Sequence, residues 1–269
     1  MDNLIIVNGS LNSEKSLILD NGYNFGRGVF ETILVKQQPL FLERHCERLK
    51  RGLRKLNIKS SVDSQYILKC IKQHKISECV LKVIVSEKNV VLCTRDITYT
   101  HDDYENGLGV RISDLRRNPY SHTTYIKSLN YLDNILEKEK AGEDGYGEVM
   151  FLNTNNELAE GSVSNVFFVK QGKLLTPEIG CGILDGIVRA WVIEEFEVSQ
   201  GRYSIEDFLQ AEEVFITNCV MGIMRVSHIN GVCLPKKNWI YSSVRNKYEA
   251  FIDFHKPIAK AKENRPLPV

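Results

Sequence analysis

The sequence predicts an α+β protein built from two lobes, and three observations lead to that prediction. Apolar residues recur at spacings of three and four over 42–56, as they do in an amphipathic helix. Segments rich in β-branched residues lie on both sides of this helix and dominate the second half of the chain. A length of 269 residues, with 43% hydrophobic and 26% charged residues, suits a globular chain with two cores.

The first lobe is predicted to mix strands and helices, because segments of strand-like and helical periodicity alternate along it. Its strands are expected at 4–7, 29–35, 79–85, 90–94 and 109–115. Its helices are expected at 42–56 and 64–74. The first of these helices has an apolar face made of Leu42, Cys46, Leu49, Leu53 and Leu56.

The link between the lobes is predicted at 118–122, where polar residues surround Pro119, which cannot easily extend a strand or a helix. The N-terminal lobe is then 1–117 and the C-terminal lobe is 123–269. In the second lobe, helices are expected at 128–141, 187–196 and 242–254. Strands are expected at 149–152, 166–169, 173–175, 214–217 and 223–229, and the last precedes the hairpin signal Asn230-Gly231.

Charge and cysteine usage exclude several classes of partner. The chain has 35 basic and 34 acidic residues, so it lacks the field expected of a protein that binds nucleic acid or a membrane surface, and a small-molecule ligand is predicted. The first residues hold only four consecutive apolar positions, too few for a signal peptide, which predicts a cytoplasmic protein. Seven scattered cysteines without a CxxC pair predict reduced thiols and no metal site.

Lys127 and Glu160 are each weak candidates for a catalytic role on sequence position alone, but each could perform a definite chemical step. Lys127 lies among apolar neighbours just before a predicted helix, and a desolvated lysine has a lowered pKa and can attack an aldehyde as a neutral amine. Most lysines are solvated, so position alone is a weak signal. Glu160 lies in a small polar run that is typical of a surface turn. A carboxylate there could also pair with the protonated ring nitrogen of pyridoxal 5′-phosphate (PLP).

The segment 180–189 is a glycine-rich loop that opens a predicted helix, so the free N–H groups of Ile187 and Val188 could hold a phosphate. It matches neither GxGxxG nor GxxxxGK[ST], and glycine-rich helix starts without a ligand are common. The loop alone is therefore a weak signal.

Six blocks of the chain resemble the class IV aminotransferase family, the fold-type IV PLP enzymes, both in their residues and in their order along the chain. The blocks are 8–9, 22–32, 45–49, 126–130, 160–167 and 182–189. The resemblance implies a two-domain fold like that of D-amino-acid aminotransferase. It has a smaller N-terminal α/β lobe and a larger C-terminal lobe with a strand-rich core. It also implies a homodimer with each active site near the subunit boundary.

The same resemblance assigns roles to particular residues. It makes Lys127 the Schiff-base lysine, Glu160 the partner of the pyridine nitrogen and Arg48 a phosphate ligand from the first lobe. Leu184 would pack against the cofactor ring. The implied cofactor-binding set is Arg48, Glu160, Asn165, Leu184, Ile187, Val188, Asn218 and Cys219. Many relatives have a hydroxyl residue where Val188 and Cys219 stand, so these two positions are expected to contribute backbone N–H groups.

Three branches of the family compete: branched-chain aminotransferases, D-amino-acid aminotransferases and 4-amino-4-deoxychorismate lyases. The segments 80–86, 117–119 and 218–226 are most similar to the lyase branch. The D-aminotransferase branch has a tyrosine where this chain has Phe30, and an arginine and a histidine two apart where this chain has Tyr99 and His101. The lyase is therefore the first prediction and an aminotransferase the second. An inactive PLP-fold binding module is a remote third, because Lys127 and Glu160 are both present.

For the lyase, Lys127 is expected to remove the proton from the substrate carbon that bears the amine, giving 4-aminobenzoate and pyruvate. Phe30 and Thr32 are expected to shape the substrate site. One of Lys82, Arg95 and Arg111 is expected to face a substrate carboxylate, and the sequence does not choose among them.

Overall fold

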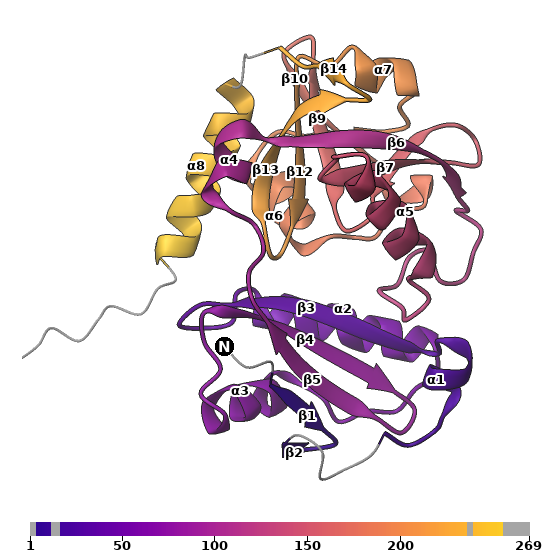
Figure 1. The fold of residues 1–269 in the computed structure, drawn as a ribbon, viewed down its shortest axis with the longest axis vertical. Coiled ribbons are helices and arrows are strands. Elements are labelled where there is room, and N and C mark those ends of the chain that lie inside the picture. Colours follow the sequence, from indigo (N-terminus) through magenta and orange to yellow (C-terminus); the bar gives the residue numbers. More distant parts are fainter. Residues whose placement is uncertain (1–3, 12–16, 236–238, 255–269) are drawn as a thin grey trace, which may run out of the picture.

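The computed structural model describes residues 4–11, 17–235 and 239–254, and it places two β-sheets in two lobes (Figure 1). Helices cover the sheets, so the predicted α+β class with two lobes is confirmed. The segment 255–269, part of the expected C-terminal lobe, lies outside the described residues. No helix in the described part of the chain is long and apolar enough to cross a membrane.

The N-terminal lobe contains an antiparallel five-stranded sheet in the order β2-β1-β5-β4-β3. Its strands are β1 (Ile5–Val7), β2 (Ser10–Leu11), β3 (Gly28–Val35), β4 (Cys79–Ser86) and β5 (Val90–Arg95). Its helices are α1 (Asn21–Phe25), α2 (Leu42–Lys55) and α3 (Ser64–Gln73). Apart from 109–115, each strand and helix predicted for this lobe is present, with ends shifted by no more than a residue or two.

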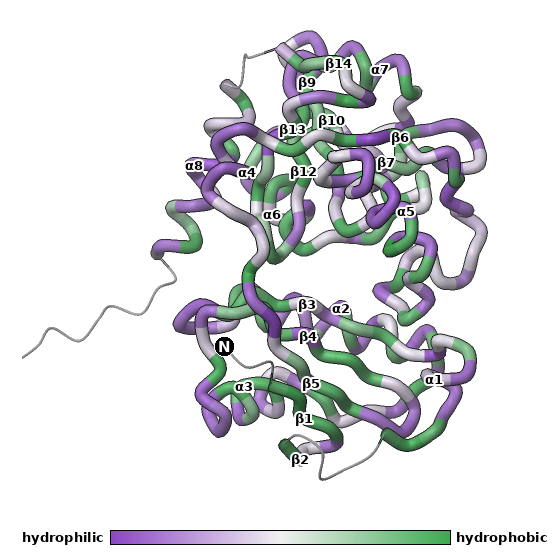
Figure 2. The backbone as a smooth tube through the Cα atoms, viewed as in Figure 1, coloured by the Kyte–Doolittle hydropathy of each residue, from purple (hydrophilic) through white to green (hydrophobic). Residues whose placement is uncertain are grey.

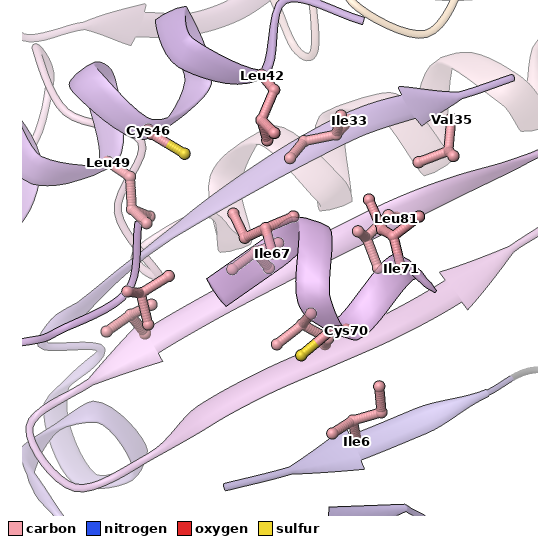
Figure 3. Packing of buried hydrophobic residues seen from close by; sticks show 14 of the residues in the cluster. Ile6, Ile33, Val35, Leu42, Cys46, Leu49, Ile67, Cys70, Ile71 and Leu81 are labelled. Atoms are coloured by element: carbon pink, nitrogen blue, oxygen red, sulfur yellow. The ribbon is translucent and has the colours of Figure 1, made fainter. Parts of the chain in front are cut away.

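Helices α2 and α3 pack against one face of this sheet (Figure 3). Because side chains alternate along a strand, Ile33 and Val35 of β3 both point toward the helices, and they share one apolar cluster with Leu42 and Leu49 of α2. Phe30, Thr32 and Leu34, which alternate with them, point the other way, toward the second lobe. In Figure 2 strands β4 and β5 are mainly hydrophobic, and β4 is largely buried whereas Leu92 is the buried residue of β5.

The C-terminal lobe contains a mixed nine-stranded sheet in the order β11-β10-β9-β12-β13-β6-β7-β8, with β14 paired to β13. The strands are β6 (Leu108–Arg117), β7 (Glu148–Asn153), β8 (Leu158–Gly161), β9 (Asn165–Lys170), β10 (Lys173–Pro177), β11 (Ser199–Gly201), β12 (Glu213–Asn218), β13 (Gly222–Ile229) and β14 (Val232–Cys233). The helices are α4 (His101–Asn106), α5 (Leu132–Glu143), η1 (Ile179–Cys181), α6 (Ile187–Glu195), α7 (Ile205–Leu209) and α8 (Trp239–Phe254). One apolar cluster lies beneath α6 and α8, and a second lies between the sheet and α7.

The predicted boundary between the lobes is wrong. Strand β6 pairs in parallel with β13 and β7, so it belongs to the second sheet and not to the N-terminal lobe. The chain crosses between the lobes after β5 and before α4, and not at 118–122 (Figure 1). Strand periodicity indicates that 109–115 is extended but not which sheet it joins. Pro119 follows the end of β6 and lies within the second lobe.

The predicted start of the helix at Ser128 is also wrong, because α5 begins at Leu132. Residues before it run alongside β3 instead. The Phe30 N–H donates to the Lys127 carbonyl at 2.8 Å, and the Leu129 N–H donates to the Gly28 carbonyl at 3.0 Å. These bonds keep the backbone around Lys127 extended and fasten it to the other lobe.

Candidate active site

A cavity of about 450 Å³ lies between the two lobes. Both lobes contribute to its wall, because Phe30 and Thr32 of β3 and Arg48 of α2 face residues of the second lobe. All eleven residues predicted for the site line this one cavity. They are Phe30, Thr32, Arg48, Lys127, Glu160, Asn165, Leu184, Ile187, Val188, Asn218 and Cys219. The structure therefore brings together residues that lie up to 189 positions apart (219 minus 30) in the sequence.

Lys127 extends its amine over two aromatic rings. The Nζ atom lies 4.4 Å from the centre of the Phe30 ring and 5.2 Å from that of Tyr131, and the two rings meet edge to face. Burial and the nearby Arg48 guanidinium lower the pKa of Lys127 to about 8. About a tenth of this amine is therefore neutral at pH 7 and about half at pH 8, far more than for an ordinary lysine, and the neutral amine is the form that acts as a nucleophile or a base.

Arg48 belongs to a buried cluster of charges whose centre is Glu31. Nε and Nη2 of Arg48 donate to the Glu31 carboxylate at 2.8 and 2.6 Å, and His45 Nδ1 lies 2.7 Å from Glu31 Oε2. Burial acts to raise the pKa of Glu31, but Arg48 and His45 lower it to about 2. Burial acts to lower the pKa of His45, but Cys219 and Glu31 raise it to about 9. One carboxylate thus lies between two cations, and of these three residues Arg48 lines the cavity.

Sequence analysis assigned no role to Glu31 or His45, although both lie in blocks that resemble the family. A signal for Glu31 was available: it is the one charged residue in the apolar strand 29–35. Its side chain lies on the same face of the strand as Ile33 and Val35, which face α2, so it had to meet a cation there or remain a costly buried charge.

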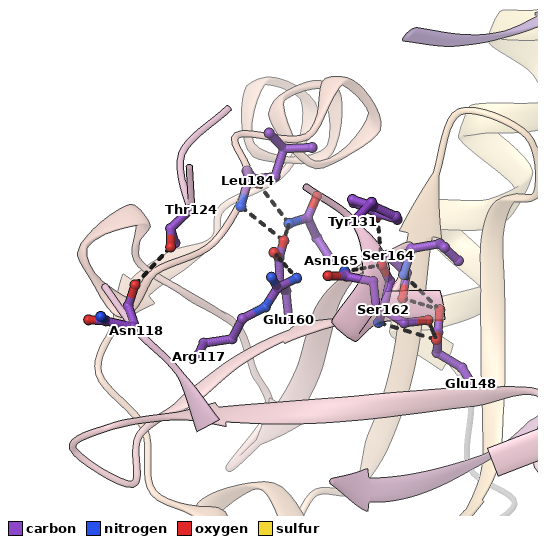
Figure 4. Close-up of polar contacts among 12 residues, drawn as sticks. Arg117, Asn118, Thr124, Tyr131, Glu148, Glu160, Ser162, Ser164, Asn165 and Leu184 are labelled. Carbon is purple, nitrogen blue, oxygen red and sulfur yellow. Dashed lines mark hydrogen bonds and ion pairs between the residues drawn. The ribbon is translucent and has the colours of Figure 1, made fainter. Parts of the chain in front are cut away.

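Glu160 lines the cavity from β8, and three groups donate hydrogen bonds to its carboxylate (Figure 4). Arg117 Nη2 donates to Oε1 at 2.8 Å. The Leu184 N–H and Asn165 Nδ2 donate to Oε2 at 2.9 and 3.4 Å. Burial raises the pKa of Glu160, although Arg117 acts to lower it. Sequence analysis used Arg117 only as the end of the predicted N-terminal lobe and as part of the lyase-like segment 117–119, and it missed this contact, which depends on β6 lying in the second sheet.

The N-terminus of α6 opens onto the cavity at Gly186, Ile187 and Val188. Gly186 is the N-cap and offers no side chain to the first turn, so the N–H groups of that turn remain available to an anion. A Cβ atom on Gly186 would lie 1.9 Å from Asn165 Oδ1. Glycine is therefore required for this close approach, which lets Asn165 Nδ2 donate to the Leu184 carbonyl at 2.9 Å.

The turn between β12 and β13 forms the adjoining wall. Asn218 Oδ1 accepts hydrogen bonds from the Val220 and Met221 N–H groups, both at 2.8 Å, and so fixes the turn. Thr217 is 1% exposed, and its hydroxyl has no hydrogen-bond partner among the residues that the structure describes. A buried hydroxyl at a cavity wall without a partner is suited to an oxygen of a bound group.

A buried carboxylate also fixes the loop at 162–164. Glu148 accepts hydrogen bonds from the hydroxyls of Ser162 and Ser164, the latter at 2.9 Å (Figure 4). The Ser162 carbonyl accepts from the Tyr131 hydroxyl at 2.6 Å and from Asn134 Nδ2 at 2.5 Å. This network connects the loop to the first turn of α5, and so positions Tyr131 beside Lys127.

The structure distinguishes among the three basic residues that the sequence offered as partners of a substrate carboxylate. Arg95 lines the cavity, whereas Lys82 and Arg111 are not among its lining residues. The Lys82 amine lies 4.7 Å from the centre of the Phe30 ring, and Arg111 pairs with Asp144. Tyr99 lines the cavity, and His101 lies at the exposed start of α4 and does not contribute to the lining.

These residues fit PLP by their chemistry. The cavity presents an amine of lowered pKa at Lys127 and a carboxylate at Glu160. It also presents an anion site made of the Arg48 guanidinium, the first N–H groups of α6 and the unpartnered Thr217 hydroxyl. An aldehyde, a ring nitrogen and a phosphate are the three groups that such a set would bind.

A family model described as Amino-transferase class IV matches residues 28–229, a span that holds all eleven predicted site residues. The chain belongs to the class IV aminotransferase family. An aminodeoxychorismate lyase of Bacillus subtilis (strain 168) is 33% identical over 256 residues, which cover 85% of this chain and 87% of that protein. A probable branched-chain-amino-acid aminotransferase of Thermotoga maritima is 30% identical over 211 residues, covering 75% and 77%.

The fold agrees with this membership. A solved 4-amino-4-deoxychorismate lyase from Pseudomonas aeruginosa has a TM-score of 0.83 at 23% identity, and the match covers 93% of this chain and 100% of that one. The predicted fold class is confirmed. As a class IV family member with these relatives, the chain is a PLP-dependent enzyme, either a lyase or an aminotransferase.

Proposed function

We propose that this class IV enzyme is a 4-amino-4-deoxychorismate lyase, which eliminates pyruvate from its substrate and leaves 4-aminobenzoate. The observation that carries the proposal is the cavity wall formed by Phe30 and Tyr99. In the resemblance to D-amino-acid aminotransferases, these positions correspond to a tyrosine and to the arginine that traps a substrate carboxylate. The relative that is 33% identical over 85% of this chain is named as a lyase, which supports the same choice.

We assign the cofactor's contacts to three groups of residues. Arg48, the first N–H groups of α6 and the β12–β13 turn hold the phosphate, and Leu184 packs on the ring. Glu160 pairs with the ring nitrogen, and the Arg117, Asn165 and Leu184 contacts keep its carboxylate oriented toward that atom. When bound, PLP withdraws electrons from the substrate carbon that loses its proton.

Lys127 attaches the cofactor and then acts as the base. Its amine has a lowered pKa, so it is available to take the proton from the substrate carbon that bears the amine. The Phe30 and Tyr131 rings lie against the Nζ atom and shield that side of it from water. Loss of the enolpyruvyl group makes the substrate ring aromatic, which drives the elimination forward.

Arg95 is the basic residue to which we assign a substrate carboxylate, because it lines the cavity where Lys82 and Arg111 do not. Thr32, on the same face of the first sheet, borders the same space and shapes the substrate site with Phe30. The residues that we assign to the substrate carboxylate and to the substrate ring thus all come from the N-terminal lobe.

The alternative within the family is an aminotransferase, favoured by the Thermotoga maritima relative at 30% identity. One preparation of the PLP-loaded protein separates the two functions. Its turnover is measured in two assays. One contains 4-amino-4-deoxychorismate alone, and the other contains D-alanine or branched-chain amino acids together with 2-oxoglutarate. Turnover of the first substrate at least tenfold faster supports the lyase. Transfer of amino groups to 2-oxoglutarate as the faster reaction would overturn it.

We also propose that the enzyme works as a homodimer. Leu132 and Leu136 of α5 are 67% and 52% exposed, and Phe25 of α1 is 74% exposed. The two helices lie on the same side of the molecule (Figure 1), and Asn130 just before α5 donates to the Gly26 carbonyl just after α1 at 3.0 Å. Neighbouring exposed apolar side chains of this kind mark a protein interface.

A further inference from the structure

Cys219 differs from the other six cysteines in its position. It lies in the turn after β12, is half-buried and lines the cavity as a free thiol. The other six do not line the cavity: four are buried, Cys93 is half-buried in the first sheet, and Cys233 is exposed on β14. Cys219 is thus the thiol that a small molecule in the cavity can reach.

Charged groups on several elements face this thiol. His45 and Arg48 approach it from α2, Glu31 from β3 and Lys127 from the segment before α5, and the Tyr248 phenol faces it from α8. Burial acts to raise the pKa of Cys219, but His45 and then Arg48 outweigh burial and lower it. Two cations therefore favour the thiolate.

Two buried polar groups lie nearby. His45 is 1% exposed and its Nδ1 is taken by Glu31, and its ring interacts with the Cys219 thiol, so Nε2 has no partner other than that thiol among the described residues. The Thr217 hydroxyl, also 1% exposed and without a hydrogen-bond partner in the described part of the chain, lies two residues before Cys219 in the same wall. Of the groups around His45, Cys219 acts most strongly on its pKa, so the imidazole and the thiol face each other. The surroundings are built to hold a negative group at this place.

We propose that Cys219 is a site of reversible oxidation, which reacts with hydroperoxides while the cofactor is absent and is shielded by the cofactor phosphate. The inference rests on the proposed cofactor contacts but not on the choice between lyase and aminotransferase.

The reaction is a two-electron oxidation of sulfur. The thiolate attacks one peroxide oxygen, the O–O bond breaks as the S–O bond forms, and the departing hydroxide takes a proton to become water. A small thiol then converts the sulfenic acid to a mixed disulfide with loss of water. A second small thiol restores Cys219 and leaves as the disulfide of the two small thiols.

Oxidation changes the anion site itself. A sulfenate places a negative oxygen beside Arg48 and His45, and a mixed disulfide fills part of the cavity next to Thr217. Either product competes with a phosphate for the same donors. The oxidised protein is therefore expected to lose affinity for the cofactor until a thiol reduces it.

The test follows each cysteine by mass spectrometry of peptides from the full-length protein, with the cofactor removed or restored. Hydrogen peroxide and the sulfenate trap dimedone are added together, with inorganic phosphate or PLP as the shielding anion. Cys219 is expected to be trapped about tenfold faster than Cys93, whose pKa burial raises, and about tenfold more slowly once phosphate or PLP saturates the site. Trapping of Cys219 no faster than Cys93, or unchanged by both anions, would overturn the proposal.

Matched variants supply a second readout, the PLP content after peroxide treatment and desalting. Peroxide-treated wild type and Cys93→Ser are expected to rebind at most a tenth of the PLP that they bind after reduction, whereas Cys219→Ser binds the same amount with or without peroxide. Equal loss in Cys219→Ser and wild type would contradict the proposal. Normal trapping of Cys219 without any lyase turnover would support the thiol site and overturn the lyase assignment, so the two failures are distinguishable.

Discussion

At the scale of single residues, Glu31 determines how two cations can be buried beside the cavity. It accepts from Arg48 at 2.8 and 2.6 Å and lies 2.7 Å from His45, and it is 1% exposed. Removing one partner of such a cluster costs more than the cluster contributes, because the remaining charges stay buried without compensation. The carboxylate is thus a positioning group for Arg48, and through it for the anion site.

Substitution Glu31→Gln is expected to lower the free energy of unfolding by about 3–5 kcal/mol, measured by urea denaturation. Glu194→Gln is the matched control, because Glu194 accepts two bonds from Arg44 at the exposed surface and should cost about 0–1 kcal/mol. The pKa of Glu31 falls from 4.5 to about 2 on folding, so its contribution is present above pH 4.5 and is lost as the pH falls toward 2. A difference between wild type and Glu31→Gln that does not shrink over that range would contradict the assignment.

The lowered pKa of Lys127 predicts a pH profile. With a pKa of about 8, half of its amines are neutral near pH 8, whereas an ordinary lysine of pKa 10.5 is almost fully charged there. The rate at which the cofactor-free protein takes up PLP should therefore rise with pH and level off just above pH 8. Stopped-flow absorbance of the bound cofactor measures this rate. A rate that keeps rising tenfold per pH unit to pH 10 would show that Lys127 is not perturbed.

At the scale of elements, the start of α6 is held by a close approach that only glycine permits. Gly186→Ala would push Asn165 away and break its bonds to the Leu184 carbonyl and to Glu160, since the new Cβ would meet Oδ1 at 1.9 Å. We expect a loss of about 1–3 kcal/mol in stability together with weaker PLP binding. Thermal unfolding without PLP measures the loss of stability, and the further rise in melting temperature on adding PLP measures the binding.

Gly142→Ala in α5 is the matched control, because nothing lies within 4 Å of its Cβ position. It should leave PLP binding unchanged and stabilise the protein by about 0.5–1 kcal/mol, since alanine loses less conformational freedom in a helix. Equal effects of the two substitutions would show that the contact between Gly186 and Asn165 is unimportant.

Elements defined by their own periodicity were predictable from the sequence. Helix α2 and strands β3, β4 and β5 begin and end within one or two residues of the predicted bounds. The sheet to which β6 belongs and the start of α5 were not predictable, because both depend on partners far along the chain. Leu129 shows this: it fits the helical spacing, but its N–H donates to Gly28 across the lobe boundary.

In the candidate site, too, one part was predictable from the sequence and another was not. The family resemblance indicated eleven residues, from Phe30 to Cys219, and all of them line the cavity. It did not indicate which side chains hold them in place. Arg117 reaches Glu160 only because β6 pairs with β7, and the roles of Glu31 and His45 require α2 to lie against β3.

At the scale of the whole molecule, the site belongs to neither lobe alone. Arg48 and Phe30 come from the first sheet and its helix, whereas Lys127 and Glu160 come from the second lobe. Backbone hydrogen bonds between β3 and the segment around Lys127 hold the two halves in register. An interface that adds to the contacts between the lobes should therefore strengthen the site.

Leu132→Asp is expected to shift the protein from dimer to monomer, because it places a charge on the exposed apolar surface of α5. Sedimentation velocity at micromolar concentration measures the change. Trp239→Asp is the control, since Trp239 is 84% exposed at the start of α8 on the other side of the molecule and should leave the mass unchanged (Figure 1). A wild-type protein that sediments as a monomer would contradict the proposed homodimer.

The measurement that tests the central claim most directly is the simultaneous assay of pyruvate and 4-aminobenzoate released from 4-amino-4-deoxychorismate. The PLP-loaded protein should release the two products in equal amounts, and Lys127→Ala should release neither while its fold remains intact by circular dichroism. No release from a visibly PLP-loaded protein would contradict the lyase assignment. Equal release by Lys127→Ala and by wild type would contradict the role of the lysine on which the whole site depends.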